Sequence, residues 1–327
     1  MTLNHIHTFE IHSIISIGGK NYMLNWVTPS TEILDKMKEI ITSSGEMASD
    51  LSVANIFLLR HKYDTKVAIK DGFLYRWYRN REIPGRNGVT VPIGNGDISA
   101  AMQALVDDRK ERGLPLELIF VNKDMKQYCS ENNLASAFET HEDNWDYIYS
   151  AEHLAKLEGS ENIKKRNRVN RFARLYPDWQ IRFADQDDTS ILQDMLHVED
   201  EWLSQQEDPD ESVLIEKDEI YEAIHNWSKL SLLGAVIYCN GKPAAMTIAS
   251  QISDGNFDIH FEKSYGDYAK SGAFSAINKY FSDYLYNTHN AQWINREEDM
   301  GILGLRKAKM SYCPDIRLEK YVTKLVS

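Results

Sequence analysis

Cysteine is scarce in this 327-residue chain, which has three cysteines spread over its length. Cys129, Cys239 and Cys313 are odd in number and far apart, which excludes a disulfide framework and a Cys-x-x-Cys metal site. The chain has no apolar run long enough to span a bilayer, and its first residues lack the basic start and apolar core of a signal peptide. These absences favour a cytoplasmic protein without a transmembrane segment.

Positive charge is also in short supply. Lys and Arg total 37 against 49 Asp and Glu, which gives a net charge of −12. This balance disfavours a generic nucleic-acid coat and a protein spread over an acidic membrane. His5, His7 and His12 have no carboxylate or thiol partner at metal-ligand spacing, so alternate residues of a terminal strand explain them better. We therefore predict no metal site.

The scarce cations are concentrated in one central segment, which has no acid between its first and last base: Lys164, Lys165, Arg166, Arg168, Arg171 and Arg174. Helical periodicity predicts a helix over residues 160–176, capped by Ser160 and Glu161 and ended by Pro177. One side of this helix carries an apolar stripe, at Val169, Phe172, Ala173 and Tyr176. The opposite side carries Lys164, Arg168 and Arg171. This basic face is either a solvated surface that aids solubility or a phosphate-binding site.

The remaining sequence shows one order of predicted elements twice: hairpin, strand, glycine-bearing loop, helix, strand, helix. The first copy comprises a hairpin at 65–70 and 73–79, strand 89–93, loop 94–97, a helix to 112, strand 116–121 and helix 123–132. The second comprises a meander at 232–239, 243–252 and 256–263, loop 264–273, helix 274–286, strand 292–295, helix 303–310 and strand 317–323. We therefore predict an α+β protein with two similar domains, residues 1–145 and 146–327. Each would contain a mixed, mostly antiparallel sheet flanked by helices.

The order meander, glycine loop, helix resembles the acetyltransferase (GNAT) fold. Two such units in tandem resemble the Fem peptidyltransferases and the C-terminal domain of bacterial phosphatidylglycerol lysyltransferase. Several runs look like the signature of a bacterial family that shares this lysyltransferase domain: SVANIF at 52–57, DYIYS at 146–150, KKRN at 164–167, IHFEK at 259–263, GAFSAIN at 272–278 and INREEDMGILGLRKAKMSY at 294–312. The resemblance covers nearly the whole chain and implies two tandem GNAT-like domains.

The resemblance also implies an acyl or aminoacyl transferase, because these relatives move an aminoacyl group from aminoacyl-tRNA to an amine or a lipid hydroxyl. The acceptor, a small molecule or a lipid headgroup, is left open. The candidate catalytic residues lie after the strand at 292–295 and on the following helix: Arg296, Glu298, Asp299, Arg306 and Lys309. Arg306 and Lys309 are three residues apart, share one helix face and match the G-L-R-x-x-K run of the lysyltransferase domain. The alternative is a salt-bridged loop that locks two strands together.

Further candidates are expected to bind substrate or an anion. His260 and Glu262 are two residues apart on the last strand of the meander, so we predict that they project to one face, near the glycine loop at Gly272. The cationic candidates are those of the central helix: Lys164, Lys165, Arg168 and Arg171. For His260 and Glu262 the alternative is a pair of hydrogen-bonded polar groups in the core. For the glycine loop the alternative is an ordinary turn without a ligand-binding role.

The glycine loop departs from the pattern of acetyl-CoA enzymes. The pyrophosphate loop of those enzymes has Gln or Arg, then two residues, then Gly-x-Gly or Gly-x-Ala. When the last residue of that pattern is aligned with Gly272, Lys270 falls at the first glycine position and Asp267 falls where Gln or Arg belongs. An acid that faces pyrophosphate is repulsive, so we consider acetyl-CoA doubtful and expect no required cofactor. The competing functional hypothesis is a non-catalytic relative of the acyltransferase fold that binds an anion or RNA through the basic face. We expect the C-terminal unit to carry the site.

Overall fold

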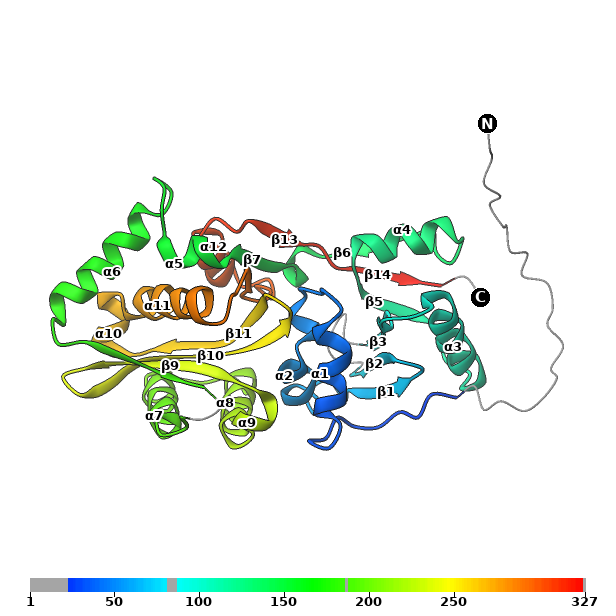
Figure 1. Ribbon diagram of the computed structural model, residues 1–327, viewed down its shortest axis with the longest axis horizontal. Coiled ribbons are helices and arrows are strands. Elements are labelled where there is room, and N and C mark those ends of the chain that lie inside the picture. Colours follow the sequence, from blue (N-terminus) through cyan, green and yellow to red (C-terminus); the bar gives the residue numbers. More distant parts are fainter. Residues whose placement is uncertain (1–22, 81–86, 186–187, 326–327) are drawn as a thin grey trace.

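The computed structural model describes residues 23–80, 87–185 and 188–325 (Figure 1). The predicted histidine tract at residues 5–12 lies outside this part of the chain. Two mixed sheets lie side by side, and helices flank both of them (Figure 1). In each sheet all strand pairs but one are antiparallel, the exceptions being β3 with β5 and β11 with β12. The predicted α+β class with two mostly antiparallel sheets is therefore confirmed.

The first sheet has the path β1-β2-β3-β5-β14-β6, with β4 paired to β2. Its strands are β1 (Lys66–Lys70), β2 (Phe73–Arg79), β3 (Asn87–Thr90), β4 (Ile93–Gly94), β5 (Glu117–Val121), β6 (Glu139–Thr140) and β14 (Tyr321–Lys324). The predicted hairpin is confirmed, with Asp71 and Gly72 in the left-handed conformation that its tight turn requires. Helices α3 (Ile98–Glu111) and α4 (Lys123–Glu131) begin at Asp97 and Asn122, whose side chains cap them.

The second sheet has the path β13-β7-β12-β11-β10-β9-β8. Its strands are β7 (Asp146–Ser150), β8 (Gln180–Ala184), β9 (Leu233–Cys239), β10 (Lys242–Ser253), β11 (Asn256–Ser264), β12 (Trp293–Asn295) and β13 (Ile316–Leu318). The predicted meander corresponds to β9, β10 and β11 and is confirmed. Its two turns, at Asn240-Gly241 and after Asp254, let long apolar strands pair along most of their length.

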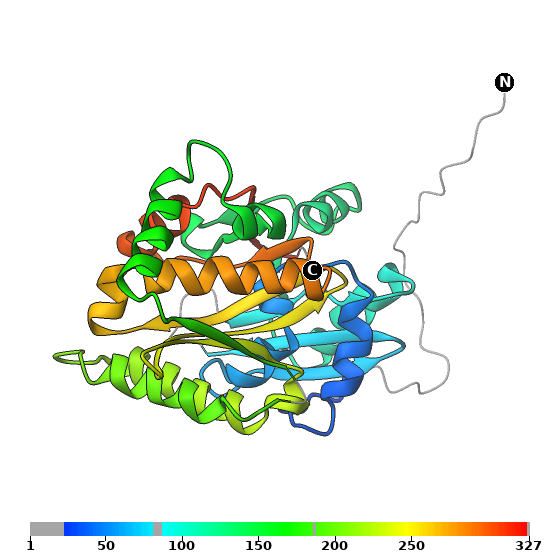
Figure 2. The same cartoon turned by 60° about the vertical axis from the view of Figure 1, so that its left-hand side comes forward.

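Helices cover both faces of the second sheet (Figures 1 and 2). One face carries α5 (Ala151–Lys156), α6 (Ile163–Leu175), α10 (Gly266–Ser271) and α11 (Ala273–Thr288), whose apolar residues share a core with β9, β10 and β12. The other face carries α7 (Leu192–Leu203), α8 (Glu211–His225) and α9 (Trp227–Leu230). The predicted loop at 264–273 is largely α10, since only Gly272 and the residues at its start lie outside helices.

Segments from both ends of the chain tie the two sheets together. Near the N-terminus, α1 (Leu34–Thr42), the 3-10 turn η1 (Ser49–Leu51) and α2 (Val53–Leu58) follow one another; Met37 and Ile41 pack in one core with Met246 and Ile248 of the second sheet. Near the C-terminus, β13 pairs with β7 in the second sheet, and β14 then pairs with β5 and β6 in the first. The chain therefore crosses the junction between the sheets more than once.

A β-bulge distorts β11 in the middle of the second sheet. Ile248 pairs with Phe261, but its neighbour Ala249 pairs with Ile259, so β11 contains one extra residue, His260. Because a bulge reverses the alternation of side chains beyond it, residues on its two sides no longer follow a period of two. This local irregularity determines how the candidate site is built.

Candidate active site

A buried group of ions lies where β14, β7 and η1 meet, at the junction of the two sheets. The ammonium group of Lys320 contacts Asp50 and lies 2.7 Å from Oδ1 of Asp146. All three side chains are buried. Burial alone would lower the pKa of Lys320, but the carboxylates of Asp146 and Asp50 outweigh this effect and hold the pKa above its ordinary value. Lys320 is therefore cationic at neutral pH.

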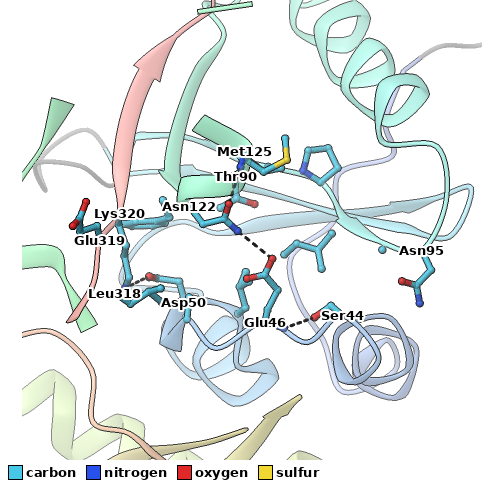
Figure 3. Close-up of a pocket in the computed structure, with 17 residues that line it drawn as sticks. Ser44, Glu46, Asp50, Thr90, Asn95, Asn122, Met125, Leu318, Glu319 and Lys320 are labelled. Carbon is cyan, nitrogen blue, oxygen red and sulfur yellow. Dashed lines mark hydrogen bonds and ion pairs between the residues drawn. The ribbon is translucent and has the colours of Figure 1, made fainter. Parts of the chain in front are cut away.

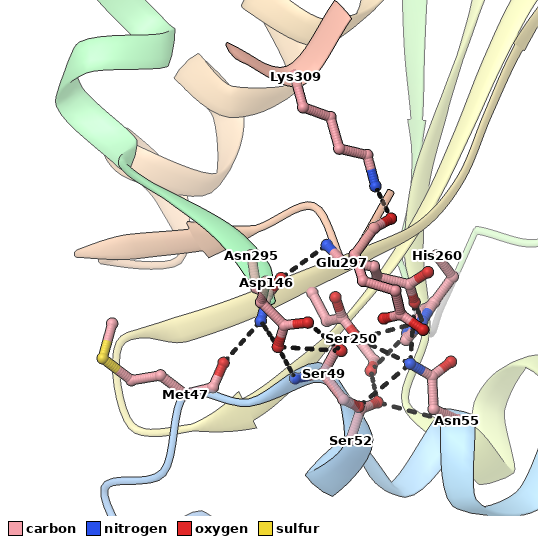
Figure 4. Close-up of polar contacts among 12 residues, drawn as sticks. Met47, Ser49, Ser52, Asn55, Asp146, Ser250, His260, Asn295, Glu297 and Lys309 are labelled. Carbon is pink, nitrogen blue, oxygen red and sulfur yellow. Dashed lines mark hydrogen bonds and ion pairs between the residues drawn. The ribbon is translucent and has the colours of Figure 1, made fainter. Parts of the chain in front are cut away.

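Asp146, the first residue of β7, organises the surrounding backbone. Its Oδ2 accepts hydrogen bonds from the backbone N–H of Ser49 at 2.9 Å and from Nδ2 of Asn295 at 2.9 Å (Figure 4). The same Asn295 amide donates to the carbonyl of Met47. One buried carboxylate thus joins the N-terminal segment to the ends of β7 and β12.

A second group of polar side chains lies beside the first and involves α2, β11 and the loop after β12. Nδ2 of Asn55 donates to Oδ2 of Asp258 at 3.0 Å and to Oε1 of Glu297 at 2.9 Å. Nδ1 of His260 lies 3.5 Å from Asp258 Oδ2 and 3.7 Å from Glu297 Oε1 (Figure 4). Glu297 reaches this position from a left-handed backbone conformation, with φ of +59°. We call Asn55, Asp258, His260 and Glu297 the acid–imidazole cluster.

The other nitrogen of His260 begins a chain of hydroxyl groups. Nε2 lies 2.8 Å from Oγ of Ser250, and that oxygen lies 3.0 Å from Oγ of Ser52. An imidazole with a hydroxyl at one nitrogen and carboxylates near the other has the arrangement of a general base held in one orientation. The cluster can therefore accept a proton and pass it along a short hydrogen-bonded path.

The carboxylates of the acid–imidazole cluster differ in their proton affinity. Burial raises the pKa of Asp258 well above its ordinary value, and the negative charges of Glu297 and Asp146 raise it further. Burial would also raise the pKa of Glu297, but the nearby imidazole of His260 and the Asn55 donor outweigh it and lower this pKa. Such divergent pKa values in neighbouring acids are typical of sites that carry out acid–base chemistry.

The ligand atoms of Asp258, His260 and Glu297 lie within 4.8 Å of one another, the spacing at which three side chains can hold a metal ion, and they form the one such group in the described residues. Two of their polar atoms, Oδ1 of Asp258 and Nδ1 of His260, have no hydrogen-bond partner there. However, the Asn55 amide already donates to both carboxylates from the space between them. This donor favours a proton-transfer or ammonium-binding site over a metal site.

A cavity of about 140 Å³ leads from the surface of the first sheet to the ion group. Asp50 and Lys320 line it, together with Glu46, Asn122 and Thr90 (Figure 3). Nδ2 of Asn122 donates to Oε1 of Glu46 at 3.3 Å, and burial raises the pKa of Glu46. The cavity lies at the ends of the parallel strands β3 and β5, where open sheets commonly bind ligands.

The model of one protein family, phosphatidylglycerol lysyltransferase, C-terminal, matches residues 42–324. The chain belongs to this family. A conserved protein of unknown function from Bacteroides thetaiotaomicron is 31% identical, with a TM-score of 0.82 over 93% of this chain and 100% of that one. No curated protein matches the sequence.

Two solved structures carry the name of the lysyltransferase. A C-terminal domain assigned to a lysylphosphatidylglycerol synthetase of Agrobacterium fabrum has a TM-score of 0.65 at 14% identity, over 91% of this chain and 93% of that one. L-PGS from Bacillus licheniformis has a TM-score of 0.63 at 15% identity, over 91% and 92%. The chain therefore has the acyltransferase-like fold of this family. In its described residues no helix combines the length and the apolar character needed to cross a membrane.

His260 and Glu262 do not share a face, contrary to the expectation from a regular strand. His260 points to the side of α2, whereas Glu262 bonds Arg296 and Asn278 on the side of α11. The bulge at His260 is the cause, because it breaks the alternation between these two positions. In this family member His260 therefore belongs to the acid–imidazole cluster, and Glu262 belongs to a separate ion pair.

Arg296 and Lys165 form a cationic group beneath α6. Arg296 is buried and pairs with Glu262 at 2.5 Å. Lys165, one of the anion-binding candidates, is also buried; its Nζ donates to Oγ of Ser311 at 2.6 Å and lies over the ring of Tyr312. Burial, with Arg168 and Arg296 nearby, lowers the pKa of Lys165 to about 7. At this position α6 faces the end of α12 (Leu303–Met310).

The remaining catalytic candidates anchor the loop 296–301. Asp299 is buried and accepts from Tyr147 and Arg306, while Arg306 also donates to Asp143 at 2.6 Å. These bonds are those of a salt-bridged loop, the alternative that the sequence left open. Lys309 donates to the backbone carbonyl of Glu298 at 2.5 Å (Figure 4), and burial lowers its pKa against the opposing charges of Glu297 and Glu298.

The three cations of the basic face, Lys164, Arg168 and Arg171, are exposed and have no ion pair within the described part of the chain. Gly272 lies in close contact with α6. A Cβ at this glycine, whose φ is +111°, would lie 2.6 Å from the carbonyl oxygen of Arg168, so α6 packs directly against it. The helix itself begins at Ile163, without the predicted side-chain cap from Ser160.

Sequence analysis missed several residues of the junction, notably Asn55, Asp258 and Lys320. Asp258 had a usable signal, because it stands two residues before His260 on the same strand and before the bulge. Asn55 stands in the SVANIF run of the family resemblance, but nothing in the sequence indicated its partner Asp258, 203 residues away. Lys320 had no signal, since its partner Asp146 is 174 residues away.

Proposed function

We propose that this chain transfers an aminoacyl group from aminoacyl-tRNA to an acceptor hydroxyl or amine, with the reaction centred on the acid–imidazole cluster. The observation that carries the proposal is the convergence of ionisable groups at the junction of the two sheets, all of them buried except the partly exposed Glu297. Asp50, Asp146, Asp258 and Glu297 face one ammonium group and one imidazole. Burial of charge without full compensation destabilises the folded state, so such a group of charges indicates a binding or catalytic role.

The charge of the junction suits an aminoacyl donor. Four carboxylates and one Lys give −3 with a neutral imidazole and −2 with a protonated one, if every acid is ionised. This surplus of negative charge contributes to the raised pKa of Asp258, because neighbouring negative charges disfavour its ionised form. The α-ammonium group of an aminoacyl ester would reduce it by one charge. Binding of the donor would then reduce the repulsion among these carboxylates.

Proton transfer would involve His260. The acceptor O–H or N–H would attack the ester carbonyl carbon, the bond from that carbon to the ribose oxygen would break, and the acceptor proton would end on the ribose oxygen. His260, oriented by Ser250 on one side and by the carboxylates on the other, is placed to take the proton and return it. The basic face of α6 offers exposed cations to the tRNA phosphates.

The test is a transfer assay with radiolabelled aminoacyl-tRNAs and two classes of acceptor, phospholipid headgroups and free amines. His260→Gln should lower turnover by about 100-fold or more, the usual contribution of a general base. The triple variant Lys164→Glu, Arg168→Glu, Arg171→Glu should weaken tRNA binding and make the remaining binding less sensitive to salt. A matched triple of exposed lysines elsewhere provides the control for net charge: Lys36→Glu, Lys110→Glu and Lys123→Glu.

Two outcomes would contradict the proposal. Turnover that is unchanged in His260→Gln would exclude the acid–imidazole cluster as the reaction centre. Salt-sensitive tRNA binding that the basic-face triple abolishes, without any product from any aminoacyl-tRNA, would instead favour a non-catalytic RNA-binding relative. The exposed and unpaired cations of α6 are the observation that supports this second function.

A further inference from the structure

Helix α12 and the loop before it expose an unusual amount of apolar surface. Five of the ten large apolar side chains that are exposed in the described part of the chain lie between residues 300 and 310: Met300, Ile302, Leu303, Leu305 and Met310. Leu303 is 78% exposed, the highest value of the ten. No residue of α12 is buried. A contiguous exposed apolar segment of this kind is typical of an interaction surface. We call residues 300–310 the apolar segment.

Polar bonds, and not apolar packing, hold α12 in place. Arg306 donates to Asp299 and Asp143, and Lys309 donates to the carbonyl of Glu298. The helix is therefore fixed on its inner side by charge, while its apolar side chains project outward. Substitution of an outward side chain should leave the fold intact because it removes no core contact.

Cations accompany the apolar segment. Lys307 is exposed on α12 itself, and α6, with its exposed Lys164, Arg168 and Arg171, lies next to it (Figures 1 and 2). The hydrogen bond from Lys165 to Ser311 joins the two elements. Two acids beside α12, Asp143 and Asp299, are already paired with Arg306. Exposed apolar side chains with unpaired cations beside them fit the surface of an anionic bilayer.

We infer that the apolar segment docks the protein on an anionic lipid surface, with Leu303 and its apolar neighbours inserted among the lipids and Lys307 of α12 at the headgroups. A second copy of the chain fits less well, because a symmetric contact would bring the same cations face to face. The net charge of −12 excludes a broad contact with such a membrane, but it does not oppose a local one. The inference does not depend on the proposed transfer reaction.

The experiment is cosedimentation of the full chain, without tRNA, with vesicles of phosphatidylcholine alone or of phosphatidylcholine and phosphatidylglycerol in equal amounts. The wild type should bind the mixed vesicles more tightly, and high salt should weaken this binding. Leu303→Ser should weaken it by about tenfold, because one leucine no longer leaves water. Leu214→Ser is the matched control: Leu214 is an exposed leucine of α8, on the other face of the second sheet, and its loss should change nothing.

Equal thermal midpoints for the two variants would show that the fold is intact. The inference is overturned if the wild type does not bind the mixed vesicles, or if Leu303→Ser and Leu214→Ser bind them alike. It is also overturned if sedimentation velocity shows a wild-type dimer that Leu303→Ser dissociates, because the apolar segment would then be a contact between copies. None of these readouts uses turnover, so failure here is distinguishable from failure of the transferase proposal.

Discussion

Replacing Lys320 by methionine removes the ammonium group that lies between Asp50 and Asp146. Methionine has a similar length and volume, so the substitution changes charge with little change in packing. Both carboxylates are buried, and Asp146 retains its bonds to Ser49 and Asn295 but loses its compensating cation. Removing one partner of a buried ion pair leaves an uncompensated charge and costs about 3–5 kcal/mol of unfolding free energy.

Lys123→Met is the matched control. Lys123 also pairs with a carboxylate, Glu319 at 3.1 Å, but its side chain is 68% exposed. Exposed ion pairs contribute about 0–1 kcal/mol, so this variant should be close to the wild type. The contrast between two Lys-to-Met changes isolates the effect of burial.

Urea-induced unfolding, followed by circular dichroism at several pH values, provides the measurement. Lys320 has a raised pKa, so its contribution is complete at neutral pH and is lost only as the pH rises above the ordinary range of lysine. The difference between Lys320→Met and the wild type should therefore have its full size at neutral pH and should shrink only at strongly alkaline pH. A loss below about 1 kcal/mol at neutral pH would refute the reasoning.

Three further outcomes are expected. Gly272→Ala should lower the free energy of urea unfolding by about 1–3 kcal/mol, because the new Cβ would lie 2.6 Å from a carbonyl oxygen of α6. The control is Gly113→Ala, since Gly113 also has a left-handed conformation but lies in open space, and this variant should lose less. Equal losses would exclude the close contact as the cause. Burial raises the pKa of Glu219 from 4.5 to about 7, so the folded state binds this proton more tightly and wild-type stability should fall as the pH rises through that interval. Glu219→Gln should remove the fall and gain up to about 3 kcal/mol above pH 7, and a pH profile of the thermal midpoint parallel to that of the wild type would contradict this. Arg306→Ala should lower the thermal midpoint, because Asp299 stays buried with fewer donors, and an unchanged midpoint would show that the ion pair is not structural.

The sequence by itself determined most of the local structure. Apolar periodicity, capping residues and turn glycines act over a few positions, so they specify elements such as the hairpin of β1 and β2, the meander of β9 to β11 and the helix at 303–310. The basic face of α6 followed from the same periodicity, because charges and apolar residues alternate with the helical repeat. The resemblance to the family could also be recognised from the sequence, because continuous runs of residues carry it.

Tertiary structure alone decided which side chains meet. The β-bulge at His260 sends that residue and Glu262 to opposite faces, although a regular strand would place them together. Lys165 belongs to a basic run, but the packing of α6 on the second sheet turns it inward. The junction of Asp50, Asp146 and Lys320 joins residues that are up to 270 positions apart. Long-range pairing, bulges and helix docking depend on contacts between distant segments, so no local pattern in the sequence specifies them.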